Sequence, residues 1–469
     1  MPESLVRVAR GLLLFGDDVE AGANRAKLLQ RLRVPNNTFR DAAPELGAVL
    51  QTPGLRFFDT ADGGVRFGPG AGIVLGVSVG SGSVHAGLVD ANGRVHAHKR
   101  LEPVAGQLSL EPIVLLDRIK AIVAEVFGAG LKDPALLAND ALPFLGMSVA
   151  WAAPVDRDTK PLGKALHPSW LDGSMLKERV AQHLNVRLHR SHALNDAHAS
   201  AIGVAWHQTR HPDHHNQEHP RMAIVMRLAG AIGGASIVVE SPERIRKPER
   251  TEELGPASGF MDSILLGGRD LHAGELGHLT LDKALIDERN ANLPPGLGPL
   301  TPFRCSCTSP GKLTPDHLEA YVCTAALAHR IAPGEPECPI IEDMINSPEV
   351  PVHTRALEDL GILLGHALRG PVLMLNPATI TLTGMLAVPT VTRTVNSYLL
   401  ANKAFGNQPD VRHMDVGANR LIRVQGAALA ILRTKVHRQI EALVGGSKDD
   451  AHRRVRDLTE PLKAVPWES

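Results

Sequence analysis

Aromatic residues, cysteines and long apolar runs are all scarce in this sequence. Aromatics make up 3% of the 469 residues, and the four cysteines are Cys305, Cys307, Cys323 and Cys338. No apolar run approaches the roughly 20 residues that a membrane-spanning helix needs. Charges lie on both sides of the leucines at 12–14, which is unlike a secretory signal peptide. We therefore expect a cytoplasmic protein that does not enter the membrane.

An excess of either charge is also lacking. Fifty Lys and Arg residues balance fifty Asp and Glu residues, so the formal net charge is zero. No global positive field favours nucleic acid, and any contact with DNA must come from a local cluster. Apolar residues make up 43% of the chain and charged residues 21%, which is typical of a globular protein. The length allows two to four domains.

The segment 1–70 predicts a small helical unit followed by a hairpin. Residues 24–32 predict a short helix with an apolar face of leucines, and a break at 34–37 precedes a second helix. Residues 55–58 and 65–67 then flank the turn signal at 62–64. This layout is that of a winged helix-turn-helix. The alternative is a small helical cap with a hairpin and no contact with DNA.

From Ile73 onward, strands and helices alternate. Ile73–Val79 and Val84–Asp90 predict one strand pair, and residues 223–226 and 235–239 predict another. An amphipathic helix is expected at 115–127. Alternation on this scale indicates α/β layers. The sequence shows no internal repeat.

Eight segments between Ile73 and Leu386 resemble, in their order, the motifs of the ROK family, which includes sugar kinases and sugar-responsive repressors. They are the glycine-rich stretch 76–83, Ala-Leu-His-Pro-Ser-Trp at 165–170, Asn-Asp with its helix at 194–203, the second glycine-rich hairpin at 229–235, Ala-Gly-Glu-Leu-Gly-His at 273–278, Cys305 with Cys307, Leu-Glu-Ala-Tyr at 318–321, and Leu-Asn-Pro at 375–377 before a strand that ends at Gly384.

The resemblance implies an α/β fold class: an N-terminal winged helix-turn-helix followed by an actin/hexokinase-like, two-lobed ROK domain. The expected divisions are the winged domain at 1–70, the first lobe at 71–192, the second lobe with the sugar and zinc sites at 193–420, a C-terminal helix at 421–443, and a polar tail at 444–469 that we expect to fray. The resemblance also implies a homodimer or homotetramer.

By the same resemblance, the sugar ligands are Asn195, Asp196, Glu275, His278 and Glu319. Carboxylates and amides suit a sugar because each hydroxyl both donates and accepts hydrogen bonds. In a kinase Asp196 would be the general base that takes the proton of the attacking hydroxyl, whereas in a repressor it only binds. Taken alone, the Asn195-Asp196 pair is equally well explained as a helix N-cap.

The family also holds a structural zinc. Its histidine and Cys-x-Cys ligands match His278, Cys305 and Cys307, but its third cysteine is replaced here by His317. Two thiolates and two imidazoles can form a tetrahedral zinc site, so these four residues are the predicted ligands. Two alternatives stay open: Cys323 supplies the fourth ligand, or no metal binds and the thiols are simply buried.

The nucleotide side departs from the family's kinases. Their Asp-x-Gly-x-Thr motif corresponds to residues 78–82, where Ser78 replaces the Asp and Gly82 the Thr. A neutral serine cannot replace the charge that an aspartate offers to Mg²⁺. The second phosphate loop reads Ala229-Gly230-Ala231 instead of Gly-Thr-Gly, which adds Cβ atoms where the backbone must approach phosphate. We therefore predict a degenerate sugar-kinase fold that binds no ATP and is not an enzyme.

The sequence thus predicts a sugar-sensing transcription regulator that binds a DNA operator and a sugar or sugar phosphate. The expected DNA-contacting residues are Arg25, Lys27, Arg31, Arg33, Asn36, Asn37, Thr38 and Arg40. One alternative is a sugar-sensing scaffold that acts through protein contacts, because charge in the segment 1–70 is nearly balanced. A sugar kinase that uses ATP is the less favoured alternative.

Overall fold

The computed structural model describes most of the chain from 71 to 432, with short strands at 51–67 and 460–461. Between 71 and 432 it leaves out 81–82, 102–111, 131–142, 153–154, 156–175, 187–190, 211–220, 240–262, 266–274, 304–316, 336, 403–407 and 415–418. The predicted DNA-contacting residues from Arg25 to Arg40 lie outside the described residues, as do Cys305 and Cys307.

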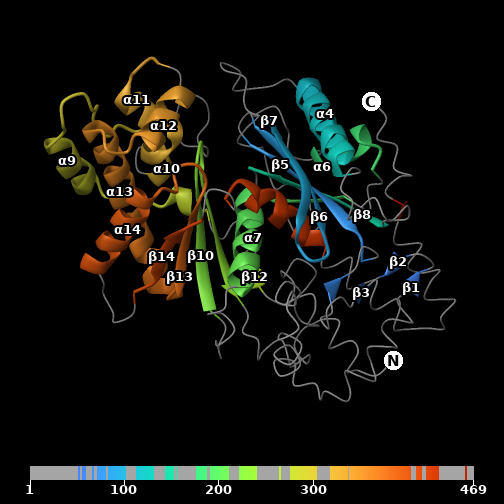
Figure 1. Ribbon diagram of the computed structural model, residues 1–469. Helices are drawn as coiled ribbons and strands as arrows, with labels where there is room; N and C mark the ends of the chain where they lie inside the picture. Colours follow the sequence, from blue (N-terminus) through green and yellow to red (C-terminus); the bar gives the residue numbers. More distant parts are fainter. Residues whose placement is uncertain are drawn as a thin grey trace.

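The first lobe is built on a six-stranded sheet (Figure 1). Its strands are β5 (Ile73–Val79), β6 (Val84–Asp90), β7 (Val95–Leu101), β8 (Pro143–Trp151), β9 (Ser191–Asn195) and β15 (Glu460–Pro461). β7, β6 and β5 are antiparallel neighbours, and β8 and β9 then continue from β5 in parallel. Helices α4 (Pro112–Gly130) and α6 (Leu176–His183) cover one face and complete an apolar core. The predicted pairing of β5 with β6 and the predicted helix at 115–127 are confirmed.

Two strand assignments differ from what the sequence suggests. β9 extends the first sheet to Asn195, three residues past the lobe boundary expected at 192. Part of the tail that we expected to fray is paired, because Glu460 and Pro461 lie opposite Phe144 and Pro143 at the edge of the sheet. Glu460 and Pro461 have no apolar pattern that would predict a strand. They pair because the edge of β8 lies beside them.

The second lobe repeats the strand pattern of the first. Its five strands are β10 (Arg221–Leu228), β11 (Ile232–Val239), β12 (Ser263–Leu265), β13 (Thr379–Thr383) and β14 (Asp410–His413), in the order β12-β11-β10-β13-β14. The first three are antiparallel, and β13 and β14 continue from β10 in parallel. The predicted pairing of 223–226 with 235–239 is confirmed.

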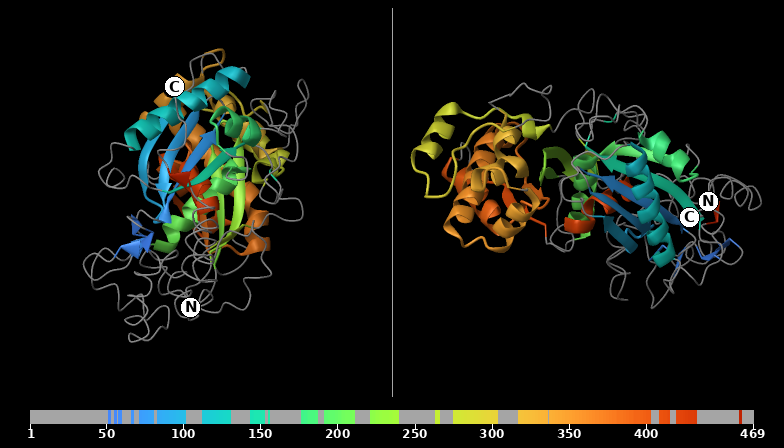
Figure 2. Two further views of the ribbon diagram at one scale, coloured as in Figure 1. Left: turned by 90° about the vertical axis from the view of Figure 1, so that its right-hand side faces the viewer. Right: turned by 90° about the horizontal axis from the view of Figure 1, so that it is seen from above.

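Helices cover both faces of the second sheet (Figures 1 and 2). Along β10, Ala223 and Val225 face α7 (Asp196–Arg210), while Ile224 and Met226 face the opposite helical layer. A strand buried on both faces reads as a continuous apolar run, which is what this segment shows. The opposite layer contains the 3₁₀ turn η7 (Leu276–His278), α9 (Lys283–Ala291), α10 (Leu318–Val322), α11 (Thr324–Ile331), α12 (Glu337–Asn346), α13 (Pro351–Leu375) and α14 (Pro389–Ala401).

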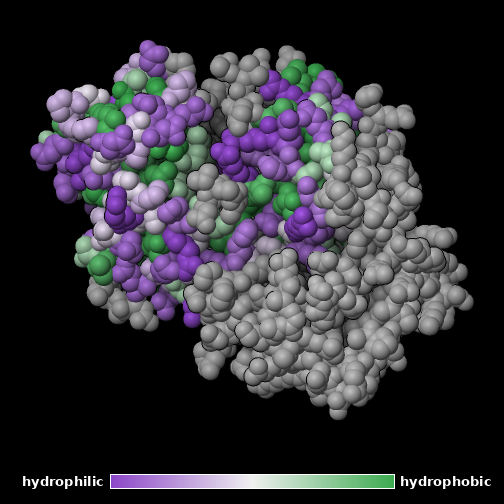
Figure 3. Space-filling model, viewed as in Figure 1, coloured by the Kyte–Doolittle hydropathy of each residue, from purple (hydrophilic) through white to green (hydrophobic). Residues whose placement is uncertain are grey.

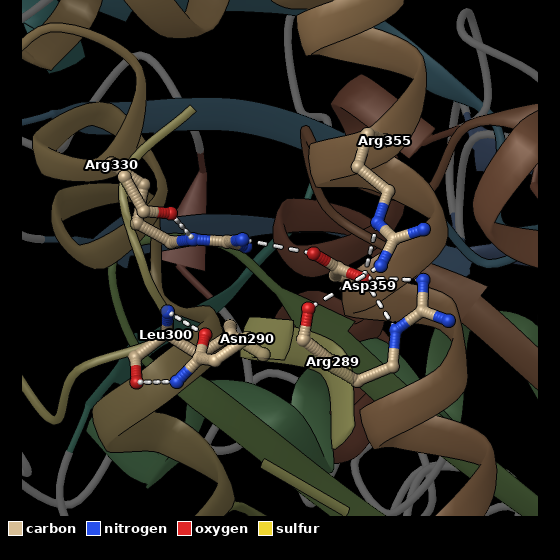
Figure 4. A network of polar contacts seen from close by, with 7 residues as sticks. Arg289, Asn290, Leu300, Arg330, Arg355 and Asp359 are labelled. Atoms are coloured by element: carbon tan, nitrogen blue, oxygen red, sulfur yellow. Dashed lines mark hydrogen bonds and ion pairs between the residues drawn. The ribbon is translucent and has the colours of Figure 1, made fainter. Parts of the chain in front are cut away.

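A buried ion network fixes that helical layer (Figure 4). Asp359 of α13 is fully buried and is contacted by Arg289 of α9 at 2.6 Å, by Arg330 of α11 at 2.8 Å and by Arg355 one turn earlier at 3.2 Å. Burial lowers the pKa of Arg330, and the hydrogen bond to Asp359 opposes that effect. One carboxylate therefore joins three helices, and its removal would leave three guanidinium groups without a counter-charge.

A helix at 419–432 lies between the two lobes and touches both (Figure 1). Its contacts are so close that they require glycine. A Cβ added to Gly76 of β5 would lie 2.2 Å from the Val424 carbonyl oxygen, and one added to Gly426 would lie 1.8 Å from the Ala199 carbonyl oxygen of α7. This helix is therefore fixed against the first sheet on one side and against α7 on the other.

In the segment 1–70 the structure describes only four two-residue strands: β1 (Gln51–Thr52), β2 (Leu55–Arg56), β3 (Phe58–Asp59) and β4 (Arg66–Phe67). β3 pairs antiparallel with β4, with Phe58 opposite Phe67, so the predicted hairpin around 62–64 is present. β1 pairs with β2 in a second hairpin that the sequence reading missed. Among the described helices, none is both long enough and apolar enough to cross a membrane.

The close contact at Gly426 generates a stability prediction. Gly426→Ala is expected to lower the free energy of unfolding by roughly 2 kcal/mol or more, because the added methyl group collides with the α7 backbone. Urea denaturation followed by circular dichroism measures this change. The control is Gly128→Ala in α4, where no atom lies within 4 Å of the added Cβ. That variant should gain about 0.5–1 kcal/mol from helix propensity. Equal stability of both variants would contradict the packing argument.

Candidate functional site

The Asn195-Asp196 pair lies where β9 ends and α7 begins, as predicted from the sequence. The Asn195 Oδ1 atom accepts hydrogen bonds from the backbone N–H groups of Ala197, at 2.8 Å, and His198, at 3.3 Å. Asn195 therefore caps α7, which is the alternative that its residue type allowed. The cap holds the side chain in place at the wall of the site.

Asp196 is buried and faces a cation on the neighbouring sheet. Its Oδ2 atom lies 3.0 Å from Nη1 of Arg227, which projects from β10. This ion pair holds the buried carboxylate in place. Because each carboxylate oxygen has more than one lone pair, Asp196 can also accept a hydrogen bond from a ligand hydroxyl group.

His198 follows on the first turn of α7 and is buried. Burial lowers the pKa of its imidazole to about 4, and the negative charge of Asp196 opposes this effect only in part. At neutral pH the ring is therefore uncharged and adds no positive charge next to Asp196.

A second polar group gathers on η7 and α10. Nε2 of His278 lies 3.5 Å from Oε2 of Glu319, which is buried. The hydrogen bond with Glu319 raises the pKa of His278, burial lowers it, and the charges of Glu319 and Glu275 raise it further. The His278 ring stacks on the ring of His317, with centroids 5.2 Å apart. The backbone holds this arrangement, since the Leu318 N–H donates to the Leu279 carbonyl at 2.9 Å.

The β10–β11 hairpin brings the two polar groups to one region. A Cβ on Gly277 of η7 would lie 2.2 Å from the Ile232 carbonyl oxygen, and one on Gly233 would lie 3.1 Å from Ala197 of α7. Consecutive residues at the start of β11 thus contact η7 and the first turn of α7. The five predicted sugar ligands therefore surround the start of β11, although their role in binding stays a prediction.

The zinc site stays a prediction as well. His278 and His317 are adjacent, as a shared metal would require, but Cys305 and Cys307 lie in the undescribed stretch 304–316. Within the described part of the chain, no group of three or more His, Cys, Asp and Glu side chains has a geometry that could hold a metal ion. Burial raises the pKa of Cys323 to about 12. Since zinc binds the thiolate, this environment favours a core thiol over a fourth ligand.

The opposite wall of the cleft carries Ser78, which the sequence analysis named, and two groups that it missed, His85 and Arg423. Ser78 of β5 lies opposite His85 of β6, and its buried hydroxyl has no hydrogen-bond partner among the described residues. Nε2 of His85 lies 3.5 Å from Nη2 of Arg423, which comes from the helix at 419–432. Burial, and then the charge of Arg423, lowers the pKa of His85 to about 2, so its ring is neutral. In the space-filling view the surface is hollowed between the lobes, with hydrophilic residues along the described rim (Figure 3).

One sequence signal could have pointed to Arg423 and Arg227. Each is a single charge within an apolar segment: Leu-Ile-Arg-Val at 421–424 and Val-Met-Arg-Leu at 225–228. A charge in such a segment is seldom buried unless it is paired or binds something.

Comparisons with known proteins identify the fold. No family model matches this sequence, and no curated protein matches it. Its structure is similar to a ROK family glucokinase from Streptomyces griseus in complex with glucose and AMPPNP, with a TM-score of 0.50, 18% identity, and coverage of 76% of this chain and 98% of that one. It is also similar to a ROK family transcriptional regulator, a homologue of the E. coli Mlc protein, with a TM-score of 0.53, 15% identity, and coverage of 93% and 99%. The predicted actin/hexokinase-like, two-lobed fold of ROK proteins is therefore confirmed.

The buried His198 generates a pH prediction. Its pKa is about 4 in the folded protein and near 6.5 when unfolded, so the unfolded chain binds the extra proton between these values. The free energy of unfolding should therefore fall as the pH falls from 6.5 to 4, by about 3 kcal/mol from this group. His198→Gln should remove that part of the slope in urea titrations at several pH values. His183→Gln, a partly exposed histidine of α6, is the control and should keep it; a slope shared by both variants and the wild type would refute the assignment.

Proposed function

We propose that the protein is a cytoplasmic, sugar-responsive transcription regulator of the ROK family, with the sugar in the cleft and DNA at the N-terminal segment 1–70. The observation that supports this most is an asymmetry between the two walls of the cleft. The wall around β11 carries buried carboxylates suited to hydroxyl groups, and the wall at β5 and β6 carries a serine and an arginine where a kinase needs an acid.

The sugar side has the chemistry that hydroxyl recognition requires. Asp196 and Glu319 are both buried, and each offers carboxylate oxygens in a place that excludes most water. Asp196 would accept hydrogen bonds from the sugar, and the His278–Glu319 pair would present a second donor and acceptor set. Glu275 lies close enough to His278 for its charge to act on that ring, so it belongs to the same group.

The other wall argues against phosphoryl transfer. A kinase binds Mg²⁺ with a carboxylate at the position of Ser78, but here the neighbouring charge is the Arg423 guanidinium. A divalent cation there would meet the positive charge of Arg423, and the nearby carboxylate of Asp196 is already paired with Arg227. The chain is therefore a binding protein on a kinase-like fold.

The likeness to the ROK regulator supports the DNA-binding half of the proposal. That alignment spans 93% of this chain, against 76% for the glucokinase. A β-hairpin is present at β3–β4, where a winged domain has its wing. The proposed readers are the cluster from Arg25 to Arg33 and the residues from Asn36 to Arg40. Sugar binding would favour the closed form of the cleft and so change the spacing of the winged domains in a homodimer or homotetramer.

Zinc is part of the proposal, with His278, Cys305, Cys307 and His317 as ligands. The stacked rings of His278 and His317 support it, because the two imidazoles lie next to each other. Such an ion would fix the ring of His278 and thereby orient its other nitrogen.

Sugar binding is tested by isothermal titration calorimetry with a panel of hexoses and amino sugars. Asp196→Asn and Glu319→Gln should each weaken binding about tenfold or more, because each removes a charged acceptor from a buried site. Glu288→Gln, an exposed acid on α9, is the matched control and should bind as the wild type does. No binding by any sugar would contradict the proposal, and so would ATP turnover that Asp196→Asn abolishes.

DNA binding is tested by fluorescence anisotropy with fragments from upstream genomic regions. A regulator should bind specific fragments. The slope of log K against log salt concentration should be about −0.9 for each phosphate contact. Arg31→Gln with Arg33→Gln should reduce that slope, and an added sugar should change the affinity. Binding without fragment preference or salt dependence would instead favour the scaffold alternative.

A further inference from the structure

Three basic side chains lie between the two lobes, near the strand that carries Ser78. Arg423 comes from the helix at 419–432, Arg227 from β10 and His85 from β6, so the three groups converge from both lobes. Arg227 is engaged by Asp196, whereas Nη1 of Arg423 is buried and has no hydrogen-bond partner among the described residues. A buried guanidinium N–H without an acceptor is costly, which points to a missing partner.

The position of Arg423 does not result from loose packing. Its neighbours Ile422 and Val424 press against Gly203 and Gly76, where an added Cβ would lie 2.6 Å and 2.2 Å from their carbonyl oxygens. The backbone of Arg423 is thus fixed between the lobes. A Cβ added to Gly80, at the turn that follows β5, would lie 3.4 Å from the Nη1 atom of Arg423. The guanidinium therefore faces the glycine-rich turn.

The charge balance around Arg423 is positive. Burial first, and then the charge of Arg227, lowers the pKa of Arg423 to about 9, while the charge of Asp196 opposes this shift. Arg423 is still protonated at neutral pH, and the neutral His85 offers it no counter-charge. One carboxylate, Asp196, thus faces two guanidinium groups.

The remaining polar groups also suit an anion. The Ser78 hydroxyl is buried, has no hydrogen-bond partner within the described part of the chain, and lies on the strand position opposite His85. A hydroxyl donor and a guanidinium donor, both next to His85, match the acceptor-only oxygens of a phosphate group. A neutral hydroxyl ligand would leave the excess positive charge without compensation.

We infer that Arg423, Ser78 and Arg227 form a pocket that binds the phosphate of a phosphate monoester, so that the effector is a sugar phosphate and not a neutral sugar. This inference rests on the proposed sugar-binding function, and it names the chemical class of the ligand. The sugar ring lies at the β11 side, and its phosphate reaches across the cleft to the helix at 419–432. The arginine that opposes Mg²⁺ thereby becomes the group that recognises the effector.

The test uses the full chain and inorganic phosphate as the first probe. Sodium phosphate should raise the melting temperature of the wild type above that in sodium chloride of equal ionic strength. Arg423→Gln should abolish this rise, and Arg423→Lys should keep part of it. Arg420→Gln, an exposed arginine on the same helix, is the matched control and should keep all of it. No specific rise in the wild type, or an equal rise in Arg423→Gln, overturns the inference.

A second variant, Ser78→Asp, tests the inference if Arg423→Gln fails to fold. It places a carboxylate next to Arg423, so it should abolish the phosphate effect while the protein melts no lower than the wild type without phosphate. If Ser78→Asp stays folded and still responds to phosphate, the assignment of the pocket is wrong.

Calorimetry with glucose, glucose 6-phosphate and AMP separates the sources of the phosphate. Glucose 6-phosphate should bind at least about tenfold more tightly than glucose, as expected for one added charged hydrogen-bonding group, and Arg423→Gln should equalise the two. Glucose binding with no phosphate preference would leave the proposed function intact and refute this inference. Tighter binding of AMP than of glucose 6-phosphate would refute the assignment to a sugar phosphate.

Discussion

The contact on which the cleft depends is the backbone-to-backbone packing of the helix at 419–432. Gly76 and Gly426 let this helix approach β5 and α7 to distances at which any side chain would collide. A helix held that closely cannot slide or rotate relative to β5 and α7 without breaking both contacts, because each contact fixes its position along the neighbouring element. The place from which the Arg423 side chain extends is therefore set by the packing of the two lobes on this helix. The same packing makes the helix part of both lobes.

The two walls that this helix separates have opposite electrostatic character. Around β11, buried carboxylates dominate, and the helical layer behind Glu319 is fixed by the Asp359 network that joins α9, α11 and α13. On the β5–β6 side Arg423 lies beside the neutral His85, and Arg227 of β10 lies between the two sides, paired with Asp196. A ligand with hydroxyl groups at one end and negative charge at the other satisfies both walls.

Much of this architecture could be predicted from the sequence, for local reasons. Strands such as Ile73–Val79 are continuous apolar runs, and the start of α7 follows from a capping Asn next to an acid. The matched strand order of the two sheets could not be predicted, because burial fixes only the apolar character of each position and leaves no visible repeat. The meeting of Arg423 with His85 could not be predicted either, since it depends on the tertiary path of the chain.

The late position of the helix at 419–432 has a consequence for how the protein is made. The face of β5 and β6 that carries Gly76 and Ser78 is covered by residues that leave the ribosome about 350 residues later, on the order of half a minute at usual rates of synthesis. Until then the first sheet has one face open to water or to chaperones. The surface of β5 around Gly76 is therefore covered only in the last stage of synthesis.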